Sequence, residues 1–255
     1  MKEIISMWEH TKMVVLVAIS AGLYAALLLP FKMIQIIPGF TEIRPAVCLP
    51  IVCSLFFGPA GAWGACIGNL VADFAGQFGP GSLFGLAGNF LYGYLPYRIW
   101  KKYKGNISKK VSRFKDFLLL IFIVVISSAV CSSVISWGLQ LIGLPFYSVS
   151  WIILLNNLIF GISLVPVLLN WLDKRVNAWQ LNYEEIMPKN SITDQRYSSI
   201  AIIILVCLLI ASFIIGYIPV ISKITGHFNE FAGLANDPVT AVLMMVLIII
   251  FALLV

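Results

Sequence analysis

The sequence FGPAGAWGACIGNLVAD, residues 57–73, decides the fold class. It consists almost entirely of apolar and small residues, but it ends in Asn69 and Asp73, and the region 41–98 around it carries further polar side chains. These are Glu42, Arg44, Gln77 and Asn89. Charged and amide side chains at membrane depth are costly unless they face a cavity or a partner. The region is therefore predicted to form membrane helices around a substrate pocket.

The composition of the whole chain also predicts a membrane protein. Hydrophobic residues make up 60% of the 255 residues, charged residues make up 11%, and the mean hydropathy is +0.98. A soluble domain of this composition would expose far too much apolar surface. The apolar runs are continuous and lack the period-two alternation of barrel strands, which favours helices. We therefore expect an all-α fold, a polytopic helical bundle in the cell membrane.

Polar and turn residues divide the chain into eight apolar segments. Six of them form the expected core, at residues 13–30, 45–57, 60–75, 82–100, 117–142 and 148–172. The polar stretch 173–197 precedes two more segments, at 198–221 and 238–255. We therefore expect three parts: a six-helix substrate-binding membrane core at 1–172, a cytoplasmic linker at 173–197, and two additional transmembrane helices at 198–255.

The segment 45–57 is short for a membrane span. At a helical rise of ~1.5 Å per residue it covers only ~20 Å of a hydrocarbon layer that is ~30 Å thick. Gly58 and Pro59 predict a tight turn directly after it. Residues 45–75 therefore either cross the membrane twice or enter it and return as a re-entrant hairpin, and both alternatives place the following segments on the same sides.

The Lys and Arg residues predict the orientation in the membrane. The loop after the fourth segment is strongly basic, with Arg98, Lys101, Lys102, Lys104, Lys109, Lys110, Arg113 and Lys115. Loops rich in Lys and Arg stay in the cytoplasm, where they also meet anionic lipids. Counting segments from this loop places the linker and both termini of the chain in the cytoplasm.

The sequence offers little for catalysis or for metal binding. All five cysteines lie in apolar segments without a CxxC pair, and His10 and His227 stand alone, so no His-ligated metal site or Ser-His-Asp arrangement follows from local spacing. The chain also lacks a GxxxxGK[ST] loop, so any ATP-driven function needs an ATPase on another chain. We expect no enzyme, no cofactor, no metal and no nucleic-acid partner.

Four short runs resemble a known family. They are TEIRPA at 41–46, FGPAGAWGA at 57–65, GNLVAD at 68–73 and GNFLYGYLPY at 88–97. Together they resemble the substrate-binding S components of energy-coupling factor (ECF) transporters, over about residues 13–172. The resemblance implies a membrane subunit that captures a vitamin or cofactor precursor and works with a transmembrane coupling protein and two cytoplasmic ATPases. The two C-terminal segments depart from the usual pattern of the family.

Polar side chains in the expected outer half of the core are the candidate substrate-binding groups. Asn69 and Asp73 are four residues apart and share a helix face, which Gln77 extends. Asn89 and Tyr92 are three residues apart on the next helix. The remaining candidates are Asn156 and Asn157 as further amides and Trp63 and Trp137 as aromatic walls. The alternative for each asparagine is a hydrogen bond between helices.

Two further features have candidate roles. Glu42 and Arg44 lie in the loop before the second segment, where they either close the loop over a ligand or form a solvated boundary pair. The first segment carries two rows of small residues, one with Ala18, Gly22 and Ala26 and the other with Ala21 and Ala25. Rows of small residues let another helix approach closely. The resemblance implies that this face docks on the coupling protein, and ordinary packing inside the bundle is the alternative.

Two other classes of function remain open at the level of sequence. A self-sufficient secondary transporter or channel for a small organic solute would use the same polar row as its pathway. A membrane enzyme would need a reactive group of side chains, for which Asp73 with Glu42 is the only pair in the sequence. Co-purification of a coupling protein and ATPases would separate an S component from both classes.

Overall fold

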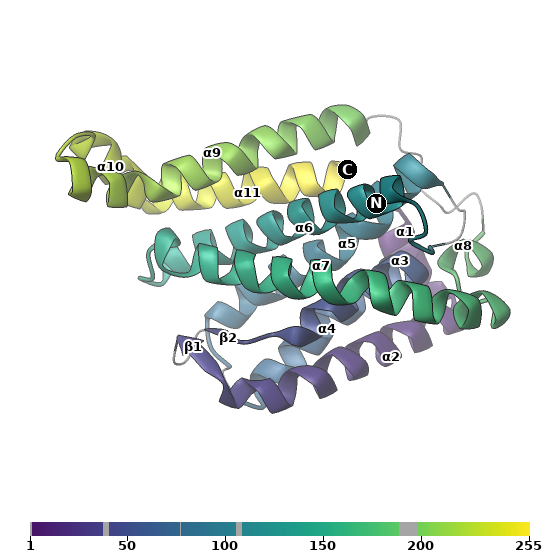
Figure 1. Cartoon of the computed structure of the whole chain (residues 1–255). Helices are drawn as coiled ribbons and strands as arrows, with labels where there is room; N and C mark the ends of the chain where they lie inside the picture. The colour runs from purple at the N-terminus through teal and green to yellow at the C-terminus, as the bar shows by residue number, and fades with distance from the viewer. Residues whose placement is uncertain (1, 38–40, 77, 106–108, 189–197) are drawn as a thin grey trace.

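The computed structural model describes residues 2–37, 41–76, 78–105, 109–188 and 198–255 (Figure 1). Its α-helices are α1 (Lys2–Ser6), α2 (Thr11–Leu28), α3 (Cys48–Phe57), α4 (Pro59–Phe74), α5 (Gly81–Lys104), α6 (Phe114–Leu141), α7 (Phe146–Ala178), α8 (Tyr183–Ile186), α9 (Ser198–Thr225), α10 (Asn229–Asn236) and α11 (Pro238–Leu254). Short 3-10 helices are η1 (Met7–Glu9), η2 (Leu29–Met33) and η3 (Pro45–Val47). A small antiparallel hairpin pairs β1 (Gln35–Ile37) with β2 (Thr41–Glu42). The prediction of an all-α helical bundle is confirmed.

Several helices are long and apolar enough to cross a membrane. Among the described residues these are Thr11–Phe31, Phe114–Leu141, Phe146–Ile186 and Ser199–Thr225. The pair α10 and α11 passes the same test if the two helices, bent by 65° at their junction, count as one span. The stretch Pro45–Phe57 is a shorter apolar helix. The chain is therefore a multi-pass membrane protein.

The helices pack in a ring whose order follows the chain only in part. α2 packs on α4, α4 on α5, α5 on α6 and α6 on α7, while α3 contacts α4, α5 and α7 and closes the ring. α9 and α11 pack together on α6, on the side of the bundle opposite to α2 (Figure 1). Both termini lie at one end of the bundle, here called the terminal end, and β1–β2 and α10 lie at the other, here called the hairpin end (Figure 1).

The chain reverses between α3 and α4 at Gly58. Gly58 has φ +56°, a left-handed conformation that glycine adopts without strain, and a Cβ there would lie 2.5 Å from the Tyr183 ring. This turn lies at the terminal end beside α8, while the start of η3 and the end of α4 meet at the hairpin end. Residues 45–74 therefore form a helical hairpin that is continuous with the rest of the ring.

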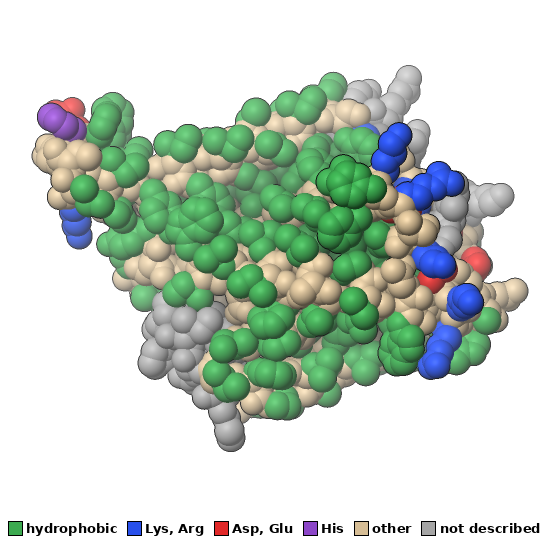
Figure 2. Space-filling view, in the orientation of Figure 1, with side chains coloured by type: hydrophobic (Ala, Val, Ile, Leu, Met, Phe, Trp, Pro, Cys, Tyr) green, Lys and Arg blue, Asp and Glu red, His purple; other side chains and the backbone are tan. Residues whose placement is uncertain are grey.

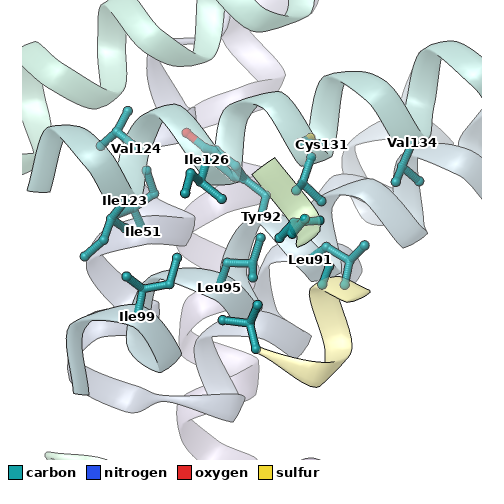
Figure 3. Packing of buried hydrophobic residues seen from close by; sticks show 14 of the residues in the cluster. Ile51, Leu91, Tyr92, Leu95, Ile99, Ile123, Val124, Ile126, Cys131 and Val134 are labelled. Atoms are coloured by element: carbon teal, nitrogen blue, oxygen red, sulfur yellow. The ribbon is translucent and has the colours of Figure 1, made fainter. Parts of the chain in front are cut away.

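The central apolar cluster lies between α3, α5 and α6 (Figure 3). It includes Leu91 and Leu95 of α5, Ile51 of α3, and Ile123 and Val124 of α6. Glycines allow the close approach of the helices, because a Cβ at Gly88 would lie 2.6 Å from Ile135. This cluster fills the middle of the bundle.

Buried polar contacts close the terminal end. Glu3 of α1 forms an ion pair with Arg98 of α5 at 2.9 Å, and both side chains are almost fully buried. Tyr97 donates its hydroxyl to the same Glu3 oxygen at 3.1 Å, and Arg98 also donates to the Val255 carbonyl at 3.1 Å. α1 and the end of α11 are thereby fastened to α5 at this end.

Candidate substrate-binding site

A cavity of about 310 Å³ lies at the hairpin end, between α4, α5, α6 and α7. Its polar lining comes from Arg44, Asn69, Asp73, Ser82, Asn89, Asn156 and Asn157. Its apolar and small lining comes from Gly79, Pro80, Gly81, Gly85, Cys131, Ile135, Leu139, Ile142 and Ile153. A concave site with apolar walls and a few convergent polar groups is the usual form of a small-molecule site.

Arg44 connects the loop after β2 to two helices of the cavity. Its guanidinium donates from Nη1 to Asn69 Oδ1 of α4 at 3.2 Å. Its backbone N–H donates to Asn156 Oδ1 of α7 at 3.1 Å. Asn69 in turn donates from Nδ2 to Asp73 Oδ2 at 3.0 Å, across one turn of α4. One polar chain thus runs from α7 through the loop to the carboxylate of Asp73.

Asn89 is held in place from two sides. Tyr24 of α2 donates its hydroxyl to Asn89 Oδ1 at 3.1 Å, and Asn89 donates from Nδ2 to the Gly85 carbonyl at 2.8 Å. Asn89 is buried and lines the cavity, so these bonds fix its orientation. The contact with Tyr24 joins residues far apart in sequence, and no local pattern in the sequence signals it.

Small residues at the start of α5 leave room for the cavity. A Cβ added at Gly85 would lie 3.2 Å from Asn69 Nδ2 and 3.8 Å from Asp73 Oδ2. The turn before the helix is held by Ser82, whose hydroxyl oxygen accepts from the Gly79 N–H at 3.3 Å. Ser82 and Cys131 also line the cavity but are absent from the predicted site. Their only signal in the sequence is a position near predicted site residues on the same segments.

The structure brings together some of the predicted substrate-binding residues. The loop residue Arg44 and the side chains of Asn69, Asp73, Asn89, Asn156 and Asn157 all line the cavity. Gln77 lies outside the described residues, and so does the side chain of Glu42. The predicted residues that line the cavity come from the loop after β2, from α4, from α5 and from α7, and the ring of helices makes them neighbours.

Three predicted residues lie away from the cavity, which corrects their assignment to its walls. Trp63 packs at the terminal end, where its indole N–H donates to the Ile4 carbonyl at 3.0 Å. Trp137 donates to Ser212 Oγ of α9 at 2.8 Å. Tyr92 lies within the central apolar cluster (Figure 3). The physical reason is that α4, α5 and α6 each have several buried faces, and the sequence does not show which face a given aromatic residue occupies.

The two small-residue rows of α2 face in different directions. Ala21 and Ala25 are buried, and α2 packs closely on α4, where a Cβ at Gly68 would lie 2.7 Å from the Ala21 carbonyl. Ala18, Gly22 and Ala26 are exposed. The prediction that both rows are free to dock is therefore corrected: Ala21 and Ala25 belong to the packing inside the bundle, because the small residues of α4 lie against them.

Membrane helices around a cavity with convergent polar side chains, and a loop that is hydrogen bonded to two of these helices, define a membrane protein that binds a small molecule. The QueT transporter family matches residues 14–174, and the chain belongs to this family. QueT proteins are substrate-binding S components of ECF-type transporters, so the chain is the substrate-capturing subunit of such a transporter for a vitamin or cofactor precursor. Nothing supports the alternative of a self-sufficient secondary transporter or channel. No curated protein and no solved structure matches the chain.

Proposed function

We propose that the cavity at the hairpin end is the substrate site of this S component and that its substrate is a queuosine precursor, the substrate type of the QueT family. The observation that carries the proposal is the polar chain from Asn156 through Arg44 and Asn69 to Asp73 along the cavity. It offers a carboxylate and amide oxygens to the donors of a ligand, and a guanidinium and amide N–H groups to its acceptors.

Arg44 is the proposed gating residue. Its guanidinium holds Asn69 while its backbone holds Asn156, so the loop after β2 is fastened to α4 and to α7. A ligand that bonds to Asn69 and Asp73 replaces the contact of the guanidinium and frees the loop to rearrange around it. Glu42 precedes Arg44 by two residues and is the second proposed member of this gate.

The proposed partners are a transmembrane coupling protein and two cytoplasmic ATPases, together forming the ECF module. The exposed row Ala18, Gly22 and Ala26 of α2 supports this, because it permits close approach of a helix from outside. α9 and α11 pack on the opposite side of the bundle and leave α2 uncovered (Figure 1). We also propose the division into a substrate-binding core at 1–172, a cytoplasmic linker at 173–197 that contains the end of α7 and α8, and two additional transmembrane helices at 198–255.

The proposed orientation places both termini in the cytoplasm and the cavity toward the outside. Lys and Arg side chains gather at the terminal end of the molecule (Figure 2), and this bias sets the cytoplasmic side. The hairpin end, with the cavity and the loop of Arg44, then faces the medium from which substrate is captured.

Cysteine labelling tests this orientation. In a cysteine-free chain, Phe78→Cys at the hairpin end should react with an impermeant thiol reagent added to intact cells, and Ser112→Cys at the terminal end should react only after permeabilisation. Both positions are exposed, so accessibility of the side chain does not limit the reaction. The opposite labelling pattern would place the cavity toward the cytoplasm and contradict uptake from outside.

Ligand titration of the purified full-length chain tests the substrate. We expect one queuosine precursor to bind per chain in the absence of ATP and of any partner, because the cavity is complete within this chain. Isothermal titration calorimetry gives the affinity and the stoichiometry. Absence of binding by a folded chain would contradict the proposed site, and tight binding of an unrelated vitamin in place of the precursor would contradict the proposed substrate.

A further inference from the structure

The C-terminal unit, made of α9, α10 and α11, lies outside the part of the chain that matches the family, which ends at residue 174. The residues that line the cavity all lie between Arg44 and Asn157. The polar contacts of the unit with the core fall into two groups: Tyr94 and Arg98 of α5 bond to the end of the unit at the terminal end, and a second group lies on α6 and α7 next to one wall of this cavity. This wall consists of Leu139, Ile142, Ile153, Asn156 and Asn157.

Gln140 connects the unit to the corner between α6 and α7. Its side chain donates from Nε2 to the Ala235 carbonyl of α10 at 3.0 Å. Its Oε1 accepts from the backbone N–H of Phe146, the first residue of α7, at 3.1 Å. The first N–H groups of a helix have no partner within the helix, so this bond satisfies a group that would otherwise be orphaned. One carboxamide thus joins α6, α7 and α10, between the lining residues Leu139 and Ile142.

α9 is fastened to the same corner one turn deeper in the bundle. Trp137 donates to Ser212 Oγ at 2.8 Å, and both side chains are completely buried. The ring of Phe146 lies 4.6 Å from that of Trp137 and 5.5 Å from that of Phe213. A Cβ at Gly216 would overlap the Phe146 ring, so glycine at this position is what allows α9 to lie so close.

A second set of bonds holds the first turns of α7. Tyr217 of α9 donates its hydroxyl to the Tyr147 carbonyl at 3.1 Å, and the same hydroxyl lies 3.0 Å from Ser150 Oγ. The Ser150 carbonyl accepts from Ser132 of α6 at 2.6 Å. Ser150 precedes the lining residue Ile153 by one turn and Asn157 by two. α9 therefore holds the part of α7 that leads directly into the cavity.

We propose that the C-terminal unit is a built-in support that sets the position of this cavity wall, and that Gln140 is the positioning residue between the two. The physical basis is that Trp137 and Ser212 are completely buried, so a broken bond between them is not replaced by bonds to solvent. Gln140 adds the bonds that hold the start of α7 and the end of α10 against α6. Loss of these bonds lets the corner between α6 and α7 move. The side chains of Asn156 and Asn157 on α7 then shift relative to the opposite side of the cavity, where Arg44 and Asn69 lie. The consequence for substrate affinity rests on the proposed function of the cavity.

The test measures access to the cavity without any ligand. Cys131 lines the cavity beside Asn157, so a full-length chain that keeps Cys131 as its only cysteine reports on the wall through its rate of alkylation by N-ethylmaleimide. Gln140→Leu, close in volume, should raise this rate about tenfold and weaken binding of a queuosine precursor by a similar factor, since it removes two hydrogen bonds. Gln140→Glu keeps an acceptor for Phe146 and should have a smaller effect.

Two controls separate positioning from general loosening. Ser163→Ala removes a hydroxyl that donates to the Ile159 carbonyl within α7, and should change neither rate nor affinity. A chain with Cys53 alone reports on a buried site of α3 away from the cavity, and Gln140→Leu should leave its alkylation rate unchanged. An equal rise at Cys53 would mean that Gln140 only stabilises the bundle and would overturn the proposal.

The remaining outcomes are also decisive. Unchanged alkylation of Cys131 in a folded Gln140→Leu chain overturns the proposal, whatever happens to affinity. The chain without the Gln140 substitution could also fail to bind a queuosine precursor. Faster alkylation of Cys131 in Gln140→Leu would then still support the role of the C-terminal unit in holding the cavity wall, and only the proposed substrate would be contradicted. Should Gln140→Leu fail to fold, Ser212→Ala, which removes the acceptor of Trp137, takes its place with the same expectations and the same criteria.

Discussion

Replacing Asp73 by asparagine is expected to weaken the binding of a queuosine precursor by about 10- to 100-fold, because a hydrogen bond to a charged group contributes about 1.5–3 kcal/mol. Asparagine has the shape of aspartate. Its Oδ1 can still accept the hydrogen bond that Asn69 Nδ2 donates to Asp73 at 3.0 Å. The cavity should therefore keep its geometry and lose only the carboxylate. Isothermal titration calorimetry on the purified chain measures the change.

Glu9→Gln is the matched control for Asp73→Asn. It removes the same charge by the same chemical change, at an exposed position at the start of the chain. Its affinity for the precursor should equal that of the unchanged chain. If a folded Asp73→Asn chain binds the precursor as tightly as the unchanged chain, the carboxylate does not contact the ligand. The proposed binding role of Asp73 would then be wrong.

Replacing Gly22 by leucine is expected to abolish stable assembly with the coupling protein while leaving the affinity for the precursor unchanged. Within the described part of the chain, a Cβ added at Gly22 meets no atom within 4 Å, so the leucine projects outward without disturbing the bundle. A helix that packs closely on the row Ala18, Gly22 and Ala26 tolerates only small side chains there. Co-purification with the coupling protein and ATP-dependent uptake in cells measure the loss.

Two comparisons sharpen this second prediction. Gly233→Leu on α10 makes the same change at an exposed glycine with the same open surroundings, far from α2, and should assemble normally. Ala21→Leu places the same bulk in the buried contact with α4 and should lower the melting temperature of the isolated chain, since overpacking costs about 1–3 kcal/mol. Normal assembly of Gly22→Leu would assign this row to lipid contact rather than to docking.

The helices themselves could be predicted closely from local sequence. The segment predicted at 117–142 is α6, Phe114–Leu141, and the segment at 238–255 is α11, Pro238–Leu254. The turn at Gly58 and Pro59 lies where the residues predict it. The segments at 82–100, 148–172 and 198–221 were predicted to end too early, because α5 continues to Lys104, α7 to Ala178 and α9 to Thr225. Continuous apolar runs, turn residues and membrane length act within one segment, so they can be read before any packing is known.

Part of the candidate site could also be predicted, but only where the spacing of residues along one helix places their side chains together. Asn69 and Asp73 are one turn apart, and they hydrogen bond to each other and line the cavity. The contact of Tyr24 with Asn89 and that of Arg44 with both Asn69 and Asn156 join distant segments. Such contacts depend on the order in which the helices pack around the ring. The spacing of residues within one segment does not predict that order.

By itself, the sequence determined that this is a helical membrane protein with polar groups at membrane depth, because the cost of burying such groups in lipid is a local property of each segment. Only the tertiary structure decided which faces of those segments meet. It turned Ala21 and Ala25 inward and Gly22 outward, and it bound Trp137 to α9 rather than to the cavity. The physical reason is that a side chain on a buried helix has several apolar neighbours available, and the packing of the whole bundle selects among them.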